Sequence, residues 1–183
     1  VPTGTVHVRN ACFERNSAAG RGGAIAVLEG GSLEIEDSRF EDNDSQLSGG
    51  AVFSELSDLY VRRSELYRNS SFGRHGGGLA SKGGWLEVDN VALAYNFAER
   101  SGSAIALYPT DDPQIRWEAA GGRMEHITAH GNTGSGFSEE STVFVEGGPL
   151  EIRSSLFTDN VGRAVIYTDR TAADADGNRL DPS

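Results

Sequence analysis

The side chains best suited to chemistry lie in one segment, YPTDDPQIRWEAAGG, which runs from Tyr108 to Gly122. The candidate binding residues in it are Tyr108, Asp111, Asp112, Arg116 and Trp117. A second stretch, TGSGFSEES, follows Asn132 and adds Glu139 and Glu140. Flat rings can stack on the faces of sugars, and carboxylates can hydrogen-bond sugar hydroxyls. These residues are therefore candidates for a carbohydrate-binding site.

The same acids could also serve catalysis. A glycoside hydrolase needs two carboxyl groups about 5 to 9.5 Å apart, whereas a polysaccharide lyase needs a base beside acids that hold calcium. The acids available to either are Asp111, Asp112, Glu118, Glu139 and Glu140. Adjacent acids are too common to select one reaction, so we assign no catalytic residue.

Trp117 also has a structural alternative to ligand binding. The small residues Gly122 and Ala129 leave a gap in the apolar pattern described below, and the indole could fold back to cover it. Both interpretations of Trp117 stay open at this point.

Two patterns suggest metal ligands. His126 and His130 are four residues apart, but only a helix brings such a pair onto one face, and this segment is typical of a strand and a turn. In DADGN, Asp174, Asp176 and Asn178 resemble the start of a calcium loop, although no Glu occupies the twelfth position. The alternative is an acidic tail, extended or a truncated cap, over residues 171–183. We expect no cofactor, with calcium as the one possible ion.

Composition excludes several classes of protein. The formal charge is −11, and fifteen arginines and the single lysine, Lys82, are scattered without a basic cluster, so nucleic acid would be repelled. No apolar run reaches the roughly 20 residues of a membrane span. The one cysteine, Cys12, cannot form an internal disulfide. The 24 glycines argue against a helical bundle, because each glycine inside a helix costs about 1 kcal/mol relative to alanine.

The candidate binding residues lie within an internal sequence repeat, which must position them. An asparagine recurs at steps of 27, 26, 27, 36 and 28 residues, and an apolar residue stands three positions before it. The asparagines are Asn16, Asn43, Asn69, Asn96, Asn132 and Asn160. The preceding apolar column is Phe13, Phe40, Leu66, Leu93, Ala129 and Phe157. The longest step contains the segment from Tyr108 to Gly122.

Strand patterns flank each asparagine. The positions seven and five residues before the apolar column are apolar in most repeats, as at Leu33 and Ile35. Apolar residues at every second position are typical of a strand. A second apolar column follows a glycine-rich tetrapeptide, and we assign it to Ile25, Val52, Leu79, Ile105, Phe144 and Val165. A period near 27 residues with short strands predicts an all-β solenoid. We expect a right-handed parallel β-helix of about six coils over residues 1–170.

Each column has a predicted structural role. The Phe40 column should point inward and stack from coil to coil. Asn43 and its equivalents should lie at a left-handed bend and form a side-chain ladder. The glycines should supply positive φ at the next corner and allow neighbouring coils to approach closely.

The repeats resemble those of a known family. The motifs F-x-x-N and G-G-A-[ILV] occur as FERN with GGAI and FEDN with GGAV, and they drift to LYRN with GGGL, LAYN with GSAI and FTDN with GRAV. They are similar to the repeats of chlamydial polymorphic outer-membrane proteins and related bacterial surface proteins, from about Val6 to Tyr167. The resemblance implies a right-handed β-helix displayed outside the bacterial cell, with structural or adhesive roles.

The leading interpretation is a non-enzymatic structural or adhesive segment of an extracellular or cell-surface protein, with glycans or host or other cell-surface proteins as partners. The alternatives are a carbohydrate-active β-helix enzyme and a carbohydrate-binding module that uses the loop at residues 108–122. Both terminal coils should expose unpaired strand edges. We therefore expect either neighbouring domains of a longer protein or end-to-end self-association.

Overall fold

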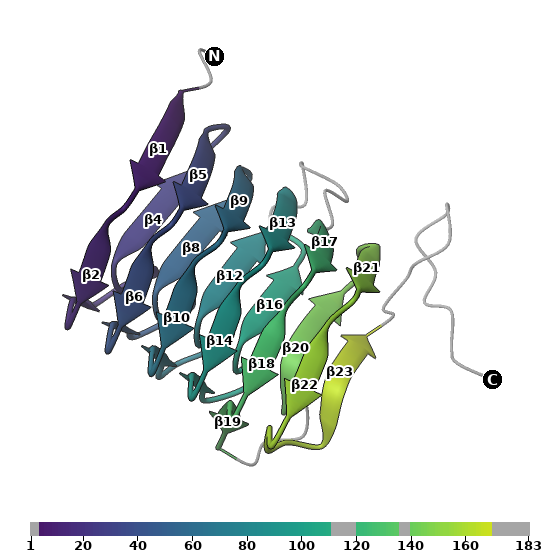
Figure 1. Cartoon of the computed structure of the whole chain (residues 1–183). Helices are drawn as coiled ribbons and strands as arrows, with labels where there is room; N and C mark the ends of the chain where they lie inside the picture. Colours follow the sequence, from purple (N-terminus) through teal and green to yellow (C-terminus); the bar gives the residue numbers. More distant parts are fainter. Residues whose placement is uncertain (1–3, 111–119, 136–139, 170–183) are drawn as a thin grey trace.

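The computed structural model describes residues 4–110, 120–135 and 140–169. Within these ranges the chain forms short β-strands and no helix, so it contains no helix that could cross a membrane. The strands wind in successive coils that advance along one axis from the N-terminus to the C-terminus (Figure 1). Equivalent strands of successive coils lie side by side and build four parallel sheets, which we call A to D.

The four sheets take their strands in chain order. Sheet A contains β1 (Thr5–Arg9), β5 (Ser32–Glu36), β9 (Asp58–Arg62), β13 (Trp85–Asp89), β17 (Gly121–Glu125) and β21 (Leu150–Arg153). Sheet B contains β2 (Cys12–Glu14), β6 (Arg39–Glu41), β10 (Glu65–Tyr67), β14 (Ala92–Ala94), β18 (Thr128–His130) and β22 (Leu156–Thr158). Sheet C contains β3 (Ser17–Ala18), β7 (Asp44–Ser45), β11 (Ser70–Ser71), β15 (Phe97–Ala98) and β19 (Thr133–Gly134). Sheet D contains β4 (Ile25–Leu28), β8 (Val52–Glu55), β12 (Leu79–Lys82), β16 (Ile105–Tyr108), β20 (Ser141–Glu146) and β23 (Ala164–Asp169).

The core is a set of stacked apolar columns inside the coils. Phe40 pairs in register with Phe13 on one side and Leu66 on the other, and the Phe13 and Phe40 rings stack with centroids 4.8 Å apart. Leu33 pairs with Leu59 in sheet A in the same way. These side chains are fully buried in the middle coils, where each contributes about 1.5 to 3 kcal/mol by removal from water.

The predicted asparagine ladder is present and runs through all six coils. In each step the backbone N–H and the side-chain Nδ2 of one asparagine both donate to Oδ1 of the next, at 2.8 to 3.1 Å. Nδ2 also donates to a carbonyl oxygen of the preceding coil, as Asn43 does to Phe13. The four inner asparagines are fully buried, so these bonds replace those that water would make.

The bend beside the ladder differs from the prediction. The left-handed residue is the one before each asparagine, as at Asp42, Arg68 and Tyr95, whose φ values are 53°, 53° and 56°. The prediction that the asparagine itself takes this conformation is wrong. The preceding residue turns the chain, and the asparagine side chain then points into the stack, where it can reach its equivalents.

The glycine pairs have the two roles that the sequence predicts. Gly49 adopts a φ of 70°, in the left-handed region that favours glycine. A Cβ atom at Gly50 would overlap the carbonyl oxygen of Gly77 in the next coil. The first glycine of the pair therefore turns the chain, and the second lets the coils approach.

The predicted inner column of sheet D is wrong in its last two coils. Ile105 pairs in register with Val143, and Val143 pairs with Ile166. Phe144 consequently lies on the outer face of sheet D, and Val165 does not belong to the inner column. The prediction aligned Ser141 with the first glycine of the other repeats, which is one residue out of register. A shift of one residue moves every side chain of a strand to the opposite face.

The gap predicted at Gly122 is filled from within the coil. A Cβ atom at Gly122 would lie 3.1 Å from Cδ2 of Leu107, which occupies this part of the core. Leu107 is fully buried. Trp117 lies outside the described ranges, so its predicted cover over this position stays a prediction.

Candidate functional site

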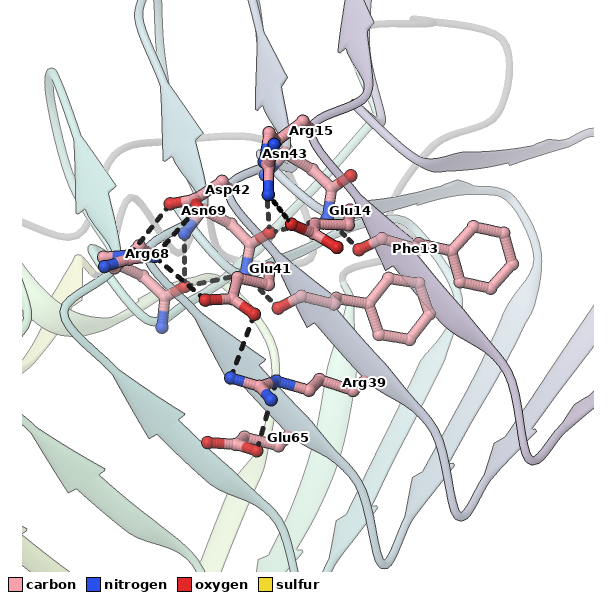
Figure 2. Close-up of polar contacts among 12 residues, drawn as sticks. Phe13, Glu14, Arg15, Arg39, Glu41, Asp42, Asn43, Glu65, Arg68 and Asn69 are labelled. Carbon is pink, nitrogen blue, oxygen red and sulfur yellow. Dashed lines mark hydrogen bonds and ion pairs between the residues drawn. The ribbon is translucent and has the colours of Figure 1, made fainter.

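Charged side chains on the outer surface of sheet B pair from coil to coil. Arg68 lies 2.8 Å from Asp42 and 2.9 Å from Glu41, and both contacts can be followed in Figure 2. Arg39 contacts Glu41 at 2.9 Å and Glu65 at 3.6 Å. The pairs between coils form because equivalent positions in parallel strands lie about 4.8 Å apart. Arg39 and Glu41 instead lie two residues apart in the same strand, β6, on the same face. Exposed pairs of this kind contribute only about 0 to 1 kcal/mol each to stability. Their main effect is that the carboxylates already have an arginine partner.

An open groove follows the bend between sheets A and B. Its charged lining includes Asp37, Arg39, Arg63, Glu65 and His126. Arg63 holds Asp37 through two hydrogen bonds of 2.8 and 3.0 Å. The hydrogen bond from Arg63 lowers the pKa of Asp37. A general acid needs a raised pKa, so Asp37 is poorly suited to that role.

Three aromatic side chains lie along the corner that follows sheet B, on three successive coils. We call Tyr67, Tyr95 and His130 the aromatic strip. The Tyr67 and Tyr95 ring centroids are 5.6 Å apart, and those of Tyr95 and His130 are 5.1 Å apart, both pairs edge to face. Tyr95 is 50% exposed. The strip therefore presents aromatic surface to solvent over three coils.

Polar contacts hold the strip in place. The Tyr95 hydroxyl lies 2.9 Å from Nε2 of His130, and Nδ1 of His130 lies 3.4 Å from Asp159. The Arg68 guanidinium lies 4.6 Å from the centre of the Tyr67 ring. These contacts limit rotamer freedom, which reduces the entropy lost when a ligand binds.

The local sequence explains where these rings point. Tyr67 and Tyr95 occupy the middle positions of LYRN and LAYN, between an inward apolar residue and the inward ladder asparagine. The middle positions must then face outward. In the next coil, Gly131 lies opposite Tyr95, and a Cβ atom there would stand 2.6 Å from the Tyr95 ring. A glycine at this position allows the ring to lie flat against the coil.

A second pair of rings, one exposed and one half-buried, lies near the strip. Phe97 follows Tyr95 by two residues, and its ring centroid is 6.1 Å from that of Phe72, which is 47% exposed. Leu47 is exposed on the preceding coil. These side chains add apolar surface next to the strip, on the outer side of sheet C.

The outer face of sheet D is apolar but closed to solvent. Phe53, Phe144 and Tyr108 belong to one buried cluster, and the His75 ring stacks on Phe144 with a centroid distance of 5.1 Å. The Arg21 guanidinium lies 5.0 Å from the centre of the Phe53 ring. This cluster is a second small core rather than an open site.

Burial changes two pKa values in this cluster. Burial, with weaker repulsion from Arg100 and Arg74, lowers the pKa of His75 to about 4. Burial also raises the pKa of Tyr108 to about 12. Both side chains are therefore neutral near pH 7, as packing residues should be.

The structure places two of the predicted ligand-binding residues and separates them. Tyr108 ends β16, whereas Glu140 immediately precedes β20. Because Leu107 pairs with Val145, the two residues lie at opposite ends of neighbouring strands, roughly 20 Å apart along the strand direction. Both are more than nine-tenths buried. The other predicted residues lie outside the described ranges: Asp111, Asp112, Arg116, Trp117, Glu139, Asp174, Asp176 and Asn178.

The two histidines with four-residue spacing have separate partners. Nδ1 of His126 lies 3.0 Å from Asp89, whereas His130 belongs to the aromatic strip. In the described part of the chain, no three His, Cys, Asp or Glu side chains come together as a metal site.

Sequence reasoning missed the aromatic strip because it searched the insertions for function. The available signal was the outward orientation of the middle positions in each F-x-x-N motif. Applied to LYRN, LAYN and AHGN, that rule places Tyr67, Tyr95 and His130 on one outer corner.

Comparisons with known proteins agree with this architecture. The model of the family described as right handed beta helix region matches residues 5–180. One curated relative, metabotropic glutamate receptor-like protein R of Dictyostelium discoideum, is 33% identical over 104 residues, which cover 56% of this chain and 6% of that protein. No solved structure matches. The predicted right-handed parallel β-helix of about six coils is confirmed, and the chain belongs to the right-handed β-helix family.

Proposed function

We propose that this chain is a non-enzymatic structural and adhesive segment of an extracellular or cell-surface protein, and that the aromatic strip is its contact surface for glycans. The observation that carries the proposal is an edge-to-face row of rings on three successive coils, in which Tyr95 is exposed and Tyr67 and His130 are half-buried. Rings arranged along the axis can contact successive units of an extended glycan.

The surroundings of the strip favour a neutral glycan. The net charge of −11 repels polyanions. The Tyr95 hydroxyl, the Asp159 carboxylate and the Arg68 guanidinium flank the rings and can hydrogen-bond sugar hydroxyls. Apolar rings with polar groups at their edges match the two chemical faces of a pyranose.

The location at a cell surface has independent support. The F-x-x-N and G-G-A repeats resemble those of bacterial surface proteins, which supports a bacterial origin and an extracellular position. The curated relative is named as a receptor-like protein, and this chain covers 6% of its length. Both the repeat resemblance and the curated relative are compatible with a binding repeat region inside a larger surface protein.

Binding can be tested on an array of neutral and charged glycans, with and without calcium. We expect the chain to retain neutral glycans, and Tyr95→Ala to weaken binding about tenfold or more, since truncating a central aromatic hot spot costs about 2 kcal/mol or more. Trp85→Ala is the matched control, because Trp85 is a partly exposed aromatic residue outside the strip. Absence of any glycan binding, or equal losses in both variants, would contradict the proposal.

The non-enzymatic part needs a separate assay. Surface acids such as Glu41 and Asp42 are engaged by Arg68 rather than free for catalysis. Incubation with the bound polysaccharides should therefore release neither new reducing ends nor unsaturated products. Turnover of any of them would favour the alternative of a carbohydrate-active enzyme.

A further inference from the structure

The open groove between sheets A and B is large enough for a small ligand. Its volume is about 600 Å³, within the usual range of ligand pockets. Arg39 and Glu65, which have long side chains, line it in one outward column of sheet B. The same column continues with the short side chains of Ala92 and Thr128. This change in side-chain length leaves space above β14 and β18.

The groove adjoins the aromatic strip. Glu65, Ala92 and Thr128 line the groove and lie side by side on β10, β14 and β18. Two residues further along the same strands, the register aligns Tyr67, Ala94 and His130. Successive outward residues of a strand are about 7 Å apart. The rings of the strip therefore border the groove.

The charged and titratable side chains of the groove already have partners. The pairs are Arg63 with Asp37 at 2.8 Å, Arg39 with Glu65 at 3.6 Å, and His126 with Asp89 at 3.0 Å. A charged ligand would have to compete with these partners, whereas a neutral ligand leaves them in place. The charge pattern therefore favours a neutral ligand, as it does at the strip.

Two neutral polar side chains of the groove remain available to a ligand. Asn90 and Thr128 are exposed, and within the described part of the chain neither the Asn90 amide nor the Thr128 hydroxyl has a hydrogen-bond partner. An amide and a hydroxyl both donate and accept hydrogen bonds. Sugar hydroxyls do the same, so these two side chains are suited to a sugar unit.

The position of the groove indicates which part of a glycan it takes. The three rings of the strip come from successive coils, so a main chain that contacts all of them runs along the axis. The groove lies beside this line, on the same strands, rather than on its continuation. A sugar unit in the groove must therefore leave the main chain sideways, as a branch does.

We propose that the groove is a second subsite, which binds a neutral branch of the glycan held by the aromatic strip, with Asn90 and Thr128 as specificity-determining contacts. The inference rests on the proposed glycan-binding function and adds the class of ligand, a branched neutral glycan.

Paired oligosaccharides of neutral hexoses, linear and singly branched on the same main chain, test the inference on an array. We expect the wild type to bind the branched member about fivefold more tightly. Asn90→Gly should lower binding of the branched member to that of the linear one, and glycine accepts the φ of 53° at this position. Asn10→Gly is the matched control, because Asn10 has a φ of 50° at the equivalent bend and does not line the groove.

A second variant fills the groove instead of removing a contact. Ala92→Leu should also abolish the preference for the branched member, whereas Ala26→Leu, at an exposed position of β4 in sheet D, should keep it. The urea midpoint of every variant separates loss of binding from loss of folding.

The outcomes distinguish this inference from the proposed function. Equal binding of linear and branched members by the wild type would overturn the branch subsite alone, and so would an unchanged preference in either groove variant. Binding of neither member would overturn the subsite together with the glycan-binding function.

Discussion

Asn69 uses its full hydrogen-bonding capacity inside the protein. Its Oδ1 accepts from the backbone N–H and Nδ2 of Asn43, and its own Nδ2 donates to Oδ1 of Asn96 and to the carbonyl of Phe40. Asn69 is fully buried, so no water can replace these bonds without rearrangement. The conserved geometry of the ladder from coil to coil therefore reflects a strict hydrogen-bonding requirement at each step.

Asn69→Ala should destabilise the protein by about 3 kcal/mol or more. The change leaves two donors of Asn43 and one carbonyl without partners, and each unpaired buried group costs about 1 to 3 kcal/mol. Asn16→Ala is the matched control, because Asn16 is exposed in the first described coil and donates to only one neighbour. Urea denaturation measures both changes, and equal losses would contradict the role of the buried ladder.

His75 should make stability depend on pH. Its pKa is lowered from 6.5 to about 4 in the folded protein, mainly by burial against Phe144 and Tyr108. The unfolded chain therefore binds more protons between these values, so stability is fully present above pH 6.5 and falls as pH drops toward 4. The linked loss is about 3 kcal/mol.

His75→Phe should flatten this dependence, whereas His7→Phe should not, because the His7 side chain is half-exposed. Denaturant titrations at pH 7, 5.5 and 4 measure the effect. A profile for His75→Phe as steep as that of the wild type would show that other groups cause the pH dependence.

At the scale of the element, each strand is too short to be stable alone. The strands contain two to six residues, and a pair of such strands is at best marginal in water. Stability comes from stacking equivalent strands, which buries one side-chain column per strand position. The alternation in Leu33 and Ile35 made sheet A predictable, because both residues point into the core.

Phe40→Ala should cost about 3 to 5 kcal/mol, because the fully buried ring lies in a packed column and leaves a cavity. Phe72→Ala removes a half-exposed ring from the surface and should cost less than about 1 kcal/mol. Thermal and urea unfolding of the two variants compare them directly. Similar losses in both would mean that the Phe40 column does not support the fold.

Gly50→Ala should be among the most destabilising single-methyl changes in the chain. The added Cβ would overlap the backbone carbonyl of Gly77, so neighbouring coils would have to separate. We expect a loss above about 3 kcal/mol, or failure to fold. Gly20→Ala is the control, since no atom lies within 4 Å of its Cβ position and its stability should change little.

Sequence reasoning failed in sheet D where the repeat loses its glycine. In the first three coils a glycine pair marks the start of the strand, and the fourth coil keeps the first glycine as Gly102, whereas the fifth coil has Ser141 and Thr142 instead. Without the marker, the alignment shifted by one residue and placed Phe144 inside. The outer cluster of Phe144, His75 and Phe53 could not be predicted for the same reason, because its residues come from three coils with different motif positions.

At the scale of the whole molecule, the coil architecture was predictable but the candidate site was not. Spacing alone located the ladder from Asn16 to Asn160, because each unit buries its apolar side chains only against its neighbours. The aromatic strip depends on which outward residues of successive coils lie next to each other, as the Tyr95 ring lies next to Gly131 of the following coil. That coincidence follows from the register and the corners, which motif spacing does not specify.

Nearest-neighbour stacking also predicts how stability varies along the axis. Coils in the middle pair with described strands on both sides, whereas the first and last described coils pair with described strands on one side only. In such solenoids, local opening starts at the ends and the middle repeats open last. Each coil contains one ladder asparagine, so the backbone amides of these asparagines report the local stability of every coil.

Hydrogen exchange of the ladder amides is the most direct test of coil-on-coil stacking. We predict the slowest exchange at the backbone amides of Asn43, Asn69 and Asn96, which are fully buried and hydrogen-bonded. Exchange should be faster at Asn16, which is exposed, and at Asn160, which is half-buried. Protection should recur about every 27 residues. Rapid exchange at the three middle asparagines, or protection unrelated to the ladder, would contradict the account.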